Sequence, residues 1–238
     1  MAEMGRREVI GLDYAVTFNF LGETIGPQLT DERFVGDQTT DDPRLWVTVR
    51  DAIDAFGDTS ISYFEFGVYK GHSLAWWAGE NRHPDSRFIG FDSFKGLPEA
   101  WSMAGKEAGH FSLGGEPPVF EDSRIQFIKG LFNESVAPFL SAWTERNDHV
   151  ICHFDADLFS STVCALSAVL QAFHDRPMIW IFDEFVSEEC KAFEVFHRGF
   201  SFDFEVIAFS GEHRRYPWCI AFRITPATAR SPDSLLAD

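Results

Sequence analysis

Acidic side chains follow three apolar, β-prone runs of this sequence at the point where each run ends. They are Asp92, the pair Asp155 and Asp157, and the pair Asp183 and Glu184. In an open α/β sheet, ligands bind beyond the carboxyl ends of the strands, so we expect these carboxylates to converge. Carboxylates brought together without Lys or Arg either raise a pKa or hold a cation, and oxygen ligands favour Mg²⁺. The alternative is that these acids cap the following helices or lie solvated in loops.

A glycine turn follows the first of the predicted strands. Gly67 and Gly71 are spaced G-x-x-x-G after Glu65, and Ser73 opens a helical pattern. Such a turn presents bare backbone N–H groups to a ligand's carboxylate or phosphate. The dinucleotide fingerprint needs a third glycine, and a carboxylate beside a pyrophosphate would repel it. The cationic amino and sulfonium groups of S-adenosylmethionine are compatible with a neighbouring carboxylate. Asp92 ends the next strand, where a carboxylate can accept both ribose hydroxyl protons. The turn therefore predicts an adenosine-bearing cofactor, with an ordinary strand–helix turn as the alternative.

Composition excludes several classes of partner. The formal net charge of −17 argues against nucleic acid and against an anionic membrane surface, because both are engaged through clustered Lys and Arg. The four cysteines lack C-x-x-C spacing, which argues against a disulfide framework or a zinc site. The first ten residues have no apolar h-region, and no apolar run approaches the roughly 20 residues that span a bilayer. We therefore expect a cytoplasmic location.

The chain divides into an extension over residues 1–40, a main domain over 41–225 and a loose tail over 226–238. A helix begins at Asp42-Pro43 and ends at Gly57. Strands are then expected over 60–66, 88–91, 125–128, 149–154, 178–182, 204–209 and 218–224, and helices over 73–80, 135–144, 161–174 and 187–197. This alternation predicts a parallel sheet wound on both faces, closed by an antiparallel pair. The long segment 99–123 interrupts it and is typical of a lid or substrate loop.

Four motifs resemble those of the macrocin O-methyltransferase family, in the same order over roughly residues 60 to 200. They are E-F-G-V-Y-K-G-H-S at 65–73, F-D-S-F-K-G-L-P-E at 91–99, K-G-L-F at 129–132 and D-A-D-L-F-S-S-T at 155–162. The resemblance implies a Rossmann-like class I methyltransferase fold with a mostly parallel seven-stranded sheet and a C-terminal antiparallel hairpin. It also implies methylation of a hydroxyl by S-adenosylmethionine with Mg²⁺. Glu184-Phe185 replaces the family's D-Y after Asp183, and Phe159 replaces a tyrosine.

The hypothesis from sequence is an O-methyltransferase that acts on a small molecule such as a sugar moiety or a phenol-like natural product. The residues expected to bind the cofactor are Glu65, Gly67, Tyr69, Gly71, Ser73, Asp92, Ser93 and Gly130. Asp155, Asp183 and Glu184 are expected to hold the metal, and Asp155 or Asp157 to take the proton. An NAD(P)-dependent oxidoreductase and a non-catalytic cofactor-binding module stay open as alternatives, as do the acceptor and a homo-oligomeric state.

Overall fold

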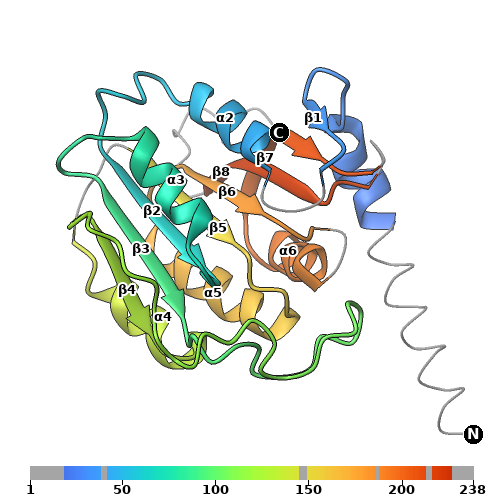
Figure 1. The fold of residues 1–238 in the computed structure, drawn as a ribbon. Coiled ribbons are helices and arrows are strands. Elements are labelled where there is room, and N and C mark those ends of the chain that lie inside the picture. Colours follow the sequence, from blue (N-terminus) through green and yellow to red (C-terminus); the bar gives the residue numbers. More distant parts are fainter. Residues whose placement is uncertain (1–18, 39–41, 145–148, 186–187, 213–215, 227–238) are drawn as a thin grey trace, which may run out of the picture.

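A single sheet of eight strands organises the chain (Figure 1). The structure is a computed structural model that describes residues 19–38, 42–144, 149–185, 188–212 and 216–226. The strands are β1 (Phe34–Gly36), β2 (Ile61–Phe66), β3 (Arg87–Asp92), β4 (Ile125–Lys129), β5 (His149–Phe154), β6 (Met178–Phe182), β7 (Phe202–Ser210) and β8 (Cys219–Pro226). The α-helices are α2 (Pro43–Asp51), α3 (His72–Glu80), α4 (Phe132–Ser141), α5 (Phe159–Ala172) and α6 (Glu188–Gly199), preceded by short turns η1 (Leu21–Ile25) and η2 (Gly26–Gln28).

The strand order is β1-β7-β8-β6-β5-β2-β3-β4, and β8 alone runs against its neighbours. The predicted fold class is therefore confirmed: a Rossmann-like, mostly parallel sheet that ends in the antiparallel β7–β8 pair. The sheet has eight strands and not the expected seven, because β1 pairs with β7 in parallel. This strand has three residues and ends at Gly36, so it is too short to show a period in the sequence.

Helices cover both faces of the sheet. Helices α4, α5 and α6 pack together on one face, while α2 and α3 cover the other (Figure 1). All six residues of β2 are buried, as expected for a central strand with helices above and below. The helix predicted from Asp42 begins there, since Asp42 Oδ1 accepts a hydrogen bond from the Arg44 backbone N–H at 3.0 Å. It ends at Asp51, so the predicted end at Gly57 is wrong.

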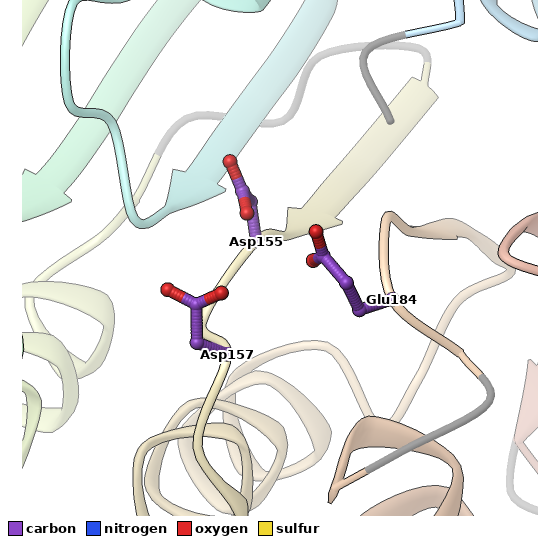
Figure 2. A group of neighbouring side chains, drawn as sticks. All are labelled: Asp155, Asp157 and Glu184. Atoms are coloured by element: carbon purple, nitrogen blue, oxygen red, sulfur yellow. The ribbon is translucent and has the colours of Figure 1, made fainter. Parts of the chain in front are cut away.

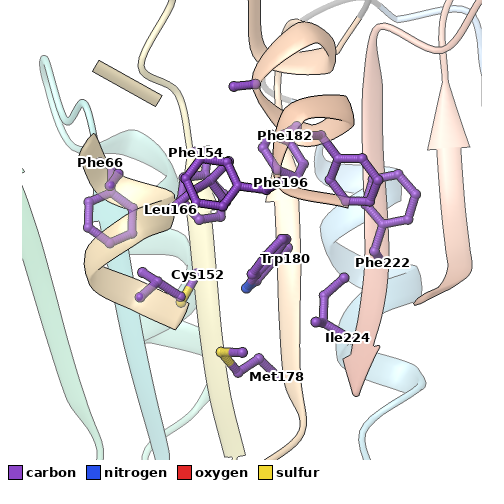
Figure 3. Packing of buried hydrophobic residues seen from close by; sticks show 14 of the residues in the cluster. Phe66, Cys152, Phe154, Leu166, Met178, Trp180, Phe182, Phe196, Phe222 and Ile224 are labelled. Atoms are coloured by element: carbon purple, nitrogen blue, oxygen red, sulfur yellow. The ribbon is translucent and has the colours of Figure 1, made fainter. Parts of the chain in front are cut away.

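A ladder of phenylalanine rings crosses the sheet near the carboxyl ends of four adjacent strands. Phe66 stacks on Phe154 at 5.1 Å between ring centroids, and Phe154 stacks on Phe182 at 4.8 Å (Figure 3). Phe66 also stacks on Phe91 at 5.2 Å. Each pair is also directly opposite in the strand register. A one-residue slip would turn every side chain of a strand to the other face, so these buried pairs hold the register. They therefore bring the residues that follow each ring to one level.

Parts of the predicted boundaries lie outside the described residues. These parts are residues 1–18 and 39–40 of the extension and residues 227–238 of the tail. In the described residues, no helix has the length and apolar character needed to cross a bilayer.

Candidate functional site

A cleft of about 600 Å³ opens at the carboxyl edge of the sheet, directly beyond the phenylalanine ladder. The residues that follow β2, β3, β4, β5 and β6 all contribute to its wall. Nine residues expected from sequence line it: Gly67, Tyr69, Asp92, Ser93, Gly130, Asp155, Asp157, Asp183 and Glu184. Three others, Glu65, Gly71 and Ser73, are not part of the lining. The predicted convergence of acids from separate strands is therefore present in the structure.

The glycine turn lies directly against the loop that follows β5. Gly67 has a φ of +92°, and a Cβ built on it would stand 1.8 Å from the Asp155 carbonyl oxygen. Only glycine permits both this backbone conformation and this close approach. Two residues on, Tyr69 also has a positive φ, of 46°. A non-glycine residue in this region is uncommon and is often found at functional sites.

Asp92 fixes the conformation of this turn. Its Oδ2 accepts the backbone N–H groups of Val68 at 3.0 Å and Tyr69 at 2.9 Å, and its Oδ1 accepts that of Phe94 at 2.7 Å. An ionised carboxylate offers about four lone-pair sites, so three of them are used here and one remains for a ligand. Asp92 lines the cleft, and its binding to ribose stays a prediction.

Strand alternation explains why Glu65 is absent from the cleft. In β2, Tyr63 and Glu65 point to the face covered by α2 and α3, and Glu65 is 1% exposed. The Tyr63 hydroxyl donates to Glu65 Oε2 at 2.8 Å and contacts His153 Nδ1 at 2.7 Å. The second His153 nitrogen, Nε2, lies 3.1 Å from Asp183 Oδ1. Four buried polar groups thus form one chain that runs beneath the strand ends.

This buried chain holds Asp183 in place. Burial, followed by the charge of Glu65, raises the pKa of Tyr63 well above its usual value, which keeps the phenol protonated. His153 is a buried histidine whose two ring nitrogens both have hydrogen-bonding partners.

Three carboxylates face one another in the cleft (Figure 2). Asp155, Asp157 and Glu184 each place a carboxylate oxygen within 4.8 Å of the others. Burial and then the charges of Glu184 and Asp183 raise the pKa of Asp155 well above its usual value, and burial with Asp183 and Asp92 raises that of Asp157 to about 7. Mutual repulsion of this kind is relieved when a cation binds between the carboxylates.

The cluster differs from the expected ligand set in one member. Asp183 lines the cleft but does not belong to this group, and Asp157 takes the third place. Asp183 directs one oxygen to His153, while Asp157 adopts a left-handed backbone with φ of 59°, in which its carboxylate faces the other two (Figure 2). Aspartate tolerates this conformation better than most residues. Neither fact is visible in the spacing of the acids along the chain.

Sequence reasoning missed Glu189, in the first turn of α6. Its side chain is fully buried, and its two oxygens accept the backbone N–H groups of Ala156 at 3.1 Å and Glu184 at 3.2 Å. Burial raises the pKa of Glu189 to about 8, although both of these hydrogen bonds lower it. The signal in the sequence is an acid five residues after Glu184, directly before Cys190, which is buried.

The segment predicted as a lid forms one wall of the cleft. Leu97 and Trp101 pack on Leu158, next to the acidic loop, and the Ser160 hydroxyl donates to Glu99 Oε1 at 2.6 Å. The Phe94 carbonyl accepts the backbone N–H groups of two residues later in the segment, at 3.0 and 2.7 Å. The segment is thus anchored both next to the acidic loop after β5 and just after the end of β3. Whether it opens stays a prediction.

No model of a protein family matches the chain, and no curated protein matches it either. Solved structures that resemble it include the O-methyltransferase NovP, with 13% identity, a TM-score of 0.49, and coverage of 90% of this chain and 98% of that one. Another is CalS11, a TDP-rhamnose 3′-O-methyltransferase of calicheamicin biosynthesis, with 17% identity, a TM-score of 0.47, and coverage of 90% and 93%. A third is an O-methyltransferase from Bacillus cereus in complex with SAH, with 13% identity, a TM-score of 0.48, and coverage of 88% and 90%. Because these scores lie below 0.5, the function proposed below rests on the geometry of the cleft.

Proposed function

We propose that the protein transfers a methyl group from S-adenosylmethionine to a hydroxyl oxygen of a small molecule, with a divalent cation bound at the acidic cluster. One observation carries this proposal: a single cleft is lined on one side by the glycine turn with Asp92 and on the other by three facing carboxylates. The close approach of Gly67 to the Asp155 carbonyl joins these two sides. A cofactor and an acceptor could therefore meet within one cleft.

The cofactor side suits an adenosine with a cationic tail. The turn at Gly67–Tyr69 is fixed by Asp92, which retains acceptor capacity toward a ribose hydroxyl. Ser93 and Gly130 line the same side of the cleft, at the ends of β3 and β4. Carboxylates across the cleft favour a positively charged sulfonium over a pyrophosphate. S-Adenosylmethionine supplies an electrophilic methyl group and leaves as S-adenosylhomocysteine.

The acidic side suits a hard divalent cation. Its donors are carboxylate oxygens on three residues, two of them buried, and cysteine is not among the residues of the cluster. Mg²⁺ prefers such oxygen donors, with water completing its coordination. We assign Asp155, Asp157 and Glu184 as the residues that would hold it. When bound, the cation would lower the pKa of the acceptor hydroxyl and orient it.

The remaining chemistry belongs to the chain's own groups. Asp155 and Asp157 lie beside each other at the acceptor side, and one of them takes the hydroxyl proton as the oxygen–methyl bond forms. The segment that carries Leu97 and Glu99 walls the cleft and excludes water from the reacting groups. Positioning of two bound molecules supplies most of the acceleration in a reaction of this kind.

Two alternatives are weighed against this assignment. An NAD(P)-dependent oxidoreductase fits less well, because antiparallel β8 lies between β6 and β7, where the dinucleotide fold continues its parallel strands. The carboxylates across from the glycine turn would also oppose a pyrophosphate. A non-catalytic cofactor-binding module would keep the glycine turn but would not require three facing carboxylates.

Calorimetry with purified protein distinguishes these functions. We expect S-adenosylhomocysteine to bind and NADH and NADPH not to bind. Mn²⁺ should bind as a probe of the metal site. The Asp157→Asn variant should bind Mn²⁺ at least about tenfold more weakly, with unchanged affinity for S-adenosylhomocysteine. The matched control is Asp58→Asn, an exposed acid before β2 at the opposite edge of the sheet. Binding of NADH in place of S-adenosylhomocysteine would refute the proposal, and cofactor binding without any Mn²⁺ binding would refute its metal part.

A panel of hydroxylated acceptors then tests catalysis. Sugars and phenols incubated with S-adenosylmethionine and Mg²⁺ should yield products heavier by one methylene group, detected by mass spectrometry. Turnover should stop with excess chelator and return with added Mg²⁺. Full turnover in the chelator would show that the three carboxylates have another role.

A further inference from the structure

Glu189 connects the two loops that carry the facing carboxylates. One of its oxygens accepts the N–H of Ala156, which stands between Asp155 and Asp157 in the loop after β5. The other accepts the N–H of Glu184 itself, in the loop after β6. The Glu189 side chain is fully buried, so solvent does not compete for these two hydrogen bonds.

The hydrogen bonds of Glu189 fall where the strands no longer hold the chain. The register of β5 and β6 ends at the pair Phe154 and Phe182, and the carboxylates come after it. Beyond this pair, the spacing between the two loops depends on contacts of the loops themselves. Glu189 reaches both from the first turn of α6, an element packed into the core through Phe193. Helix α6 is thereby connected by hydrogen bonds to both loops.

We propose that Glu189 is a positioning residue that presets the three carboxylates for a divalent cation. This inference rests on the metal site of the proposed function and adds to it a residue outside the expected ligand set. Glu189 does not itself enter the group of facing carboxylates. Its role is to hold Ala156 and Glu184 at a fixed separation, so that little rearrangement is needed when the cation binds.

Three variants test this role. Glu189→Ala removes both acceptors. Glu189→Gln keeps the side chain's size but places an amide donor against one of the two N–H groups, so one hydrogen bond is lost. The control is Glu194→Gln on the same helix, a buried acid whose partner is Arg198 at 2.9 Å. The glutamine variant serves if the alanine variant does not fold, and circular dichroism checks both.

The primary measurement is the Kd of Mn²⁺ by calorimetry on the full chain. We expect weakening of about 10- to 100-fold in Glu189→Ala, a smaller loss in Glu189→Gln, and no change in Glu194→Gln. The affinity for S-adenosylhomocysteine should not change in any of them. In a methyl-transfer assay, the metal concentration for half-maximal rate should rise while the rate at saturating Mg²⁺ recovers. A merely structural role would not separate these quantities.

Hydrogen exchange gives a readout that needs no metal. The amides of Ala156 and Glu184 should exchange faster in Glu189→Ala than in the wild type, while amides in β2 keep their protection. Wild-type Mn²⁺ affinity in Glu189→Ala would overturn the inference and leave the proposed function intact. Absence of Mn²⁺ binding in the wild type would overturn both, and binding of S-adenosylhomocysteine would then show which half of the function survives.

Discussion

Replacing Gly67 with alanine tests the contact that joins the glycine turn to the acidic loop after β5. The new Cβ would lie 1.8 Å from the Asp155 carbonyl oxygen and 2.8 Å from its carbonyl carbon. Both are backbone atoms, so no side-chain rotation can relieve the overlap. Either the glycine turn or the loop after β5 must move, and each carries residues that line the cleft.

The cost follows from the backbone conformation and the overlap. A φ of +92° is disfavoured for alanine, and such conformations cost about 1–3 kcal/mol. Adding the displacement of a buried loop, we expect Gly67→Ala to lower the free energy of unfolding by about 3–5 kcal/mol. For a chain of this size, each 1 kcal/mol corresponds to about 2–4 °C, so the Tm should fall by about 6–20 °C.

Gly79→Ala is the matched control. Gly79 lies in α3, where a Cβ meets nothing within 4 Å and the backbone is helical. Alanine there should stabilise the protein by about 0.5 kcal/mol, because it restricts the unfolded chain and suits a helix. The Tm of both variants can be measured by calorimetry, and their affinities for S-adenosylhomocysteine and Mn²⁺ by titration. Gly67→Ala should lower the affinity for both ligands, since the movement affects both sides of the cleft. Equal Tm values for the two alanine variants, with unchanged affinities, would refute the close approach.

Three further predictions concern single groups of the site. Asp92→Asn should lower the affinity for S-adenosylhomocysteine at least about tenfold in calorimetry, because charge-assisted hydrogen bonds to the turn and to ribose are lost. An unchanged affinity would contradict both roles of Asp92. Ser160→Ala removes the 2.6 Å bond to Glu99, so hydrogen exchange in the segment that carries Glu99 should become faster in the free protein; equal exchange would show that the apolar contacts suffice. The free energy of unfolding of the metal-free protein should fall as pH rises from about 4 to 8. Unfolded carboxyls release their protons near pH 4, whereas Asp157 (pKa about 7) and Glu189 (pKa about 8) retain theirs in the folded state, and the stability they contribute is lost as each ionises. In urea denaturation measured across this pH range, the free energy of unfolding of Asp157→Asn should fall less steeply with pH than that of the wild type.

Most of the fold could be predicted from the chain because its periodic segments are long and strongly apolar. Strands β2, β5 and β6 agree with the predicted ranges to within one residue. The elements that the sequence did not predict correctly are short or have irregular ends. Strand β1 has three residues and can be recognised only from its pairing with the distant strand β7. The end of α2 at Asp51 was not predicted, because apolar spacing alone does not show where the helical hydrogen bonding stops.

The candidate site could be predicted to the level of strand ends but not to individual side chains. That Asp92, Asp155 and Glu184 share one edge follows from a parallel sheet, since carboxyl ends of parallel strands meet there. The direction of each side chain depends on tertiary partners. His153 contacts one oxygen of Asp183, and Asp157 joins the facing carboxylates in its place from a left-handed backbone. No spacing rule along the chain describes a contact of that kind.

The acids of this edge divide by partner into two groups with different tasks. Asp92 and Glu189 direct their oxygens to backbone N–H groups, and thereby hold the glycine turn and the two acidic loops. Asp155, Asp157 and Glu184 face one another instead, an arrangement that repulsion makes costly unless protons or a cation are shared among them. The oxygens of the first group have partners within the protein, whereas the second group requires protons or a cation between its members. This is the physical reason to assign ligand binding to the second group, and it places the destabilised part of the structure where chemistry would occur.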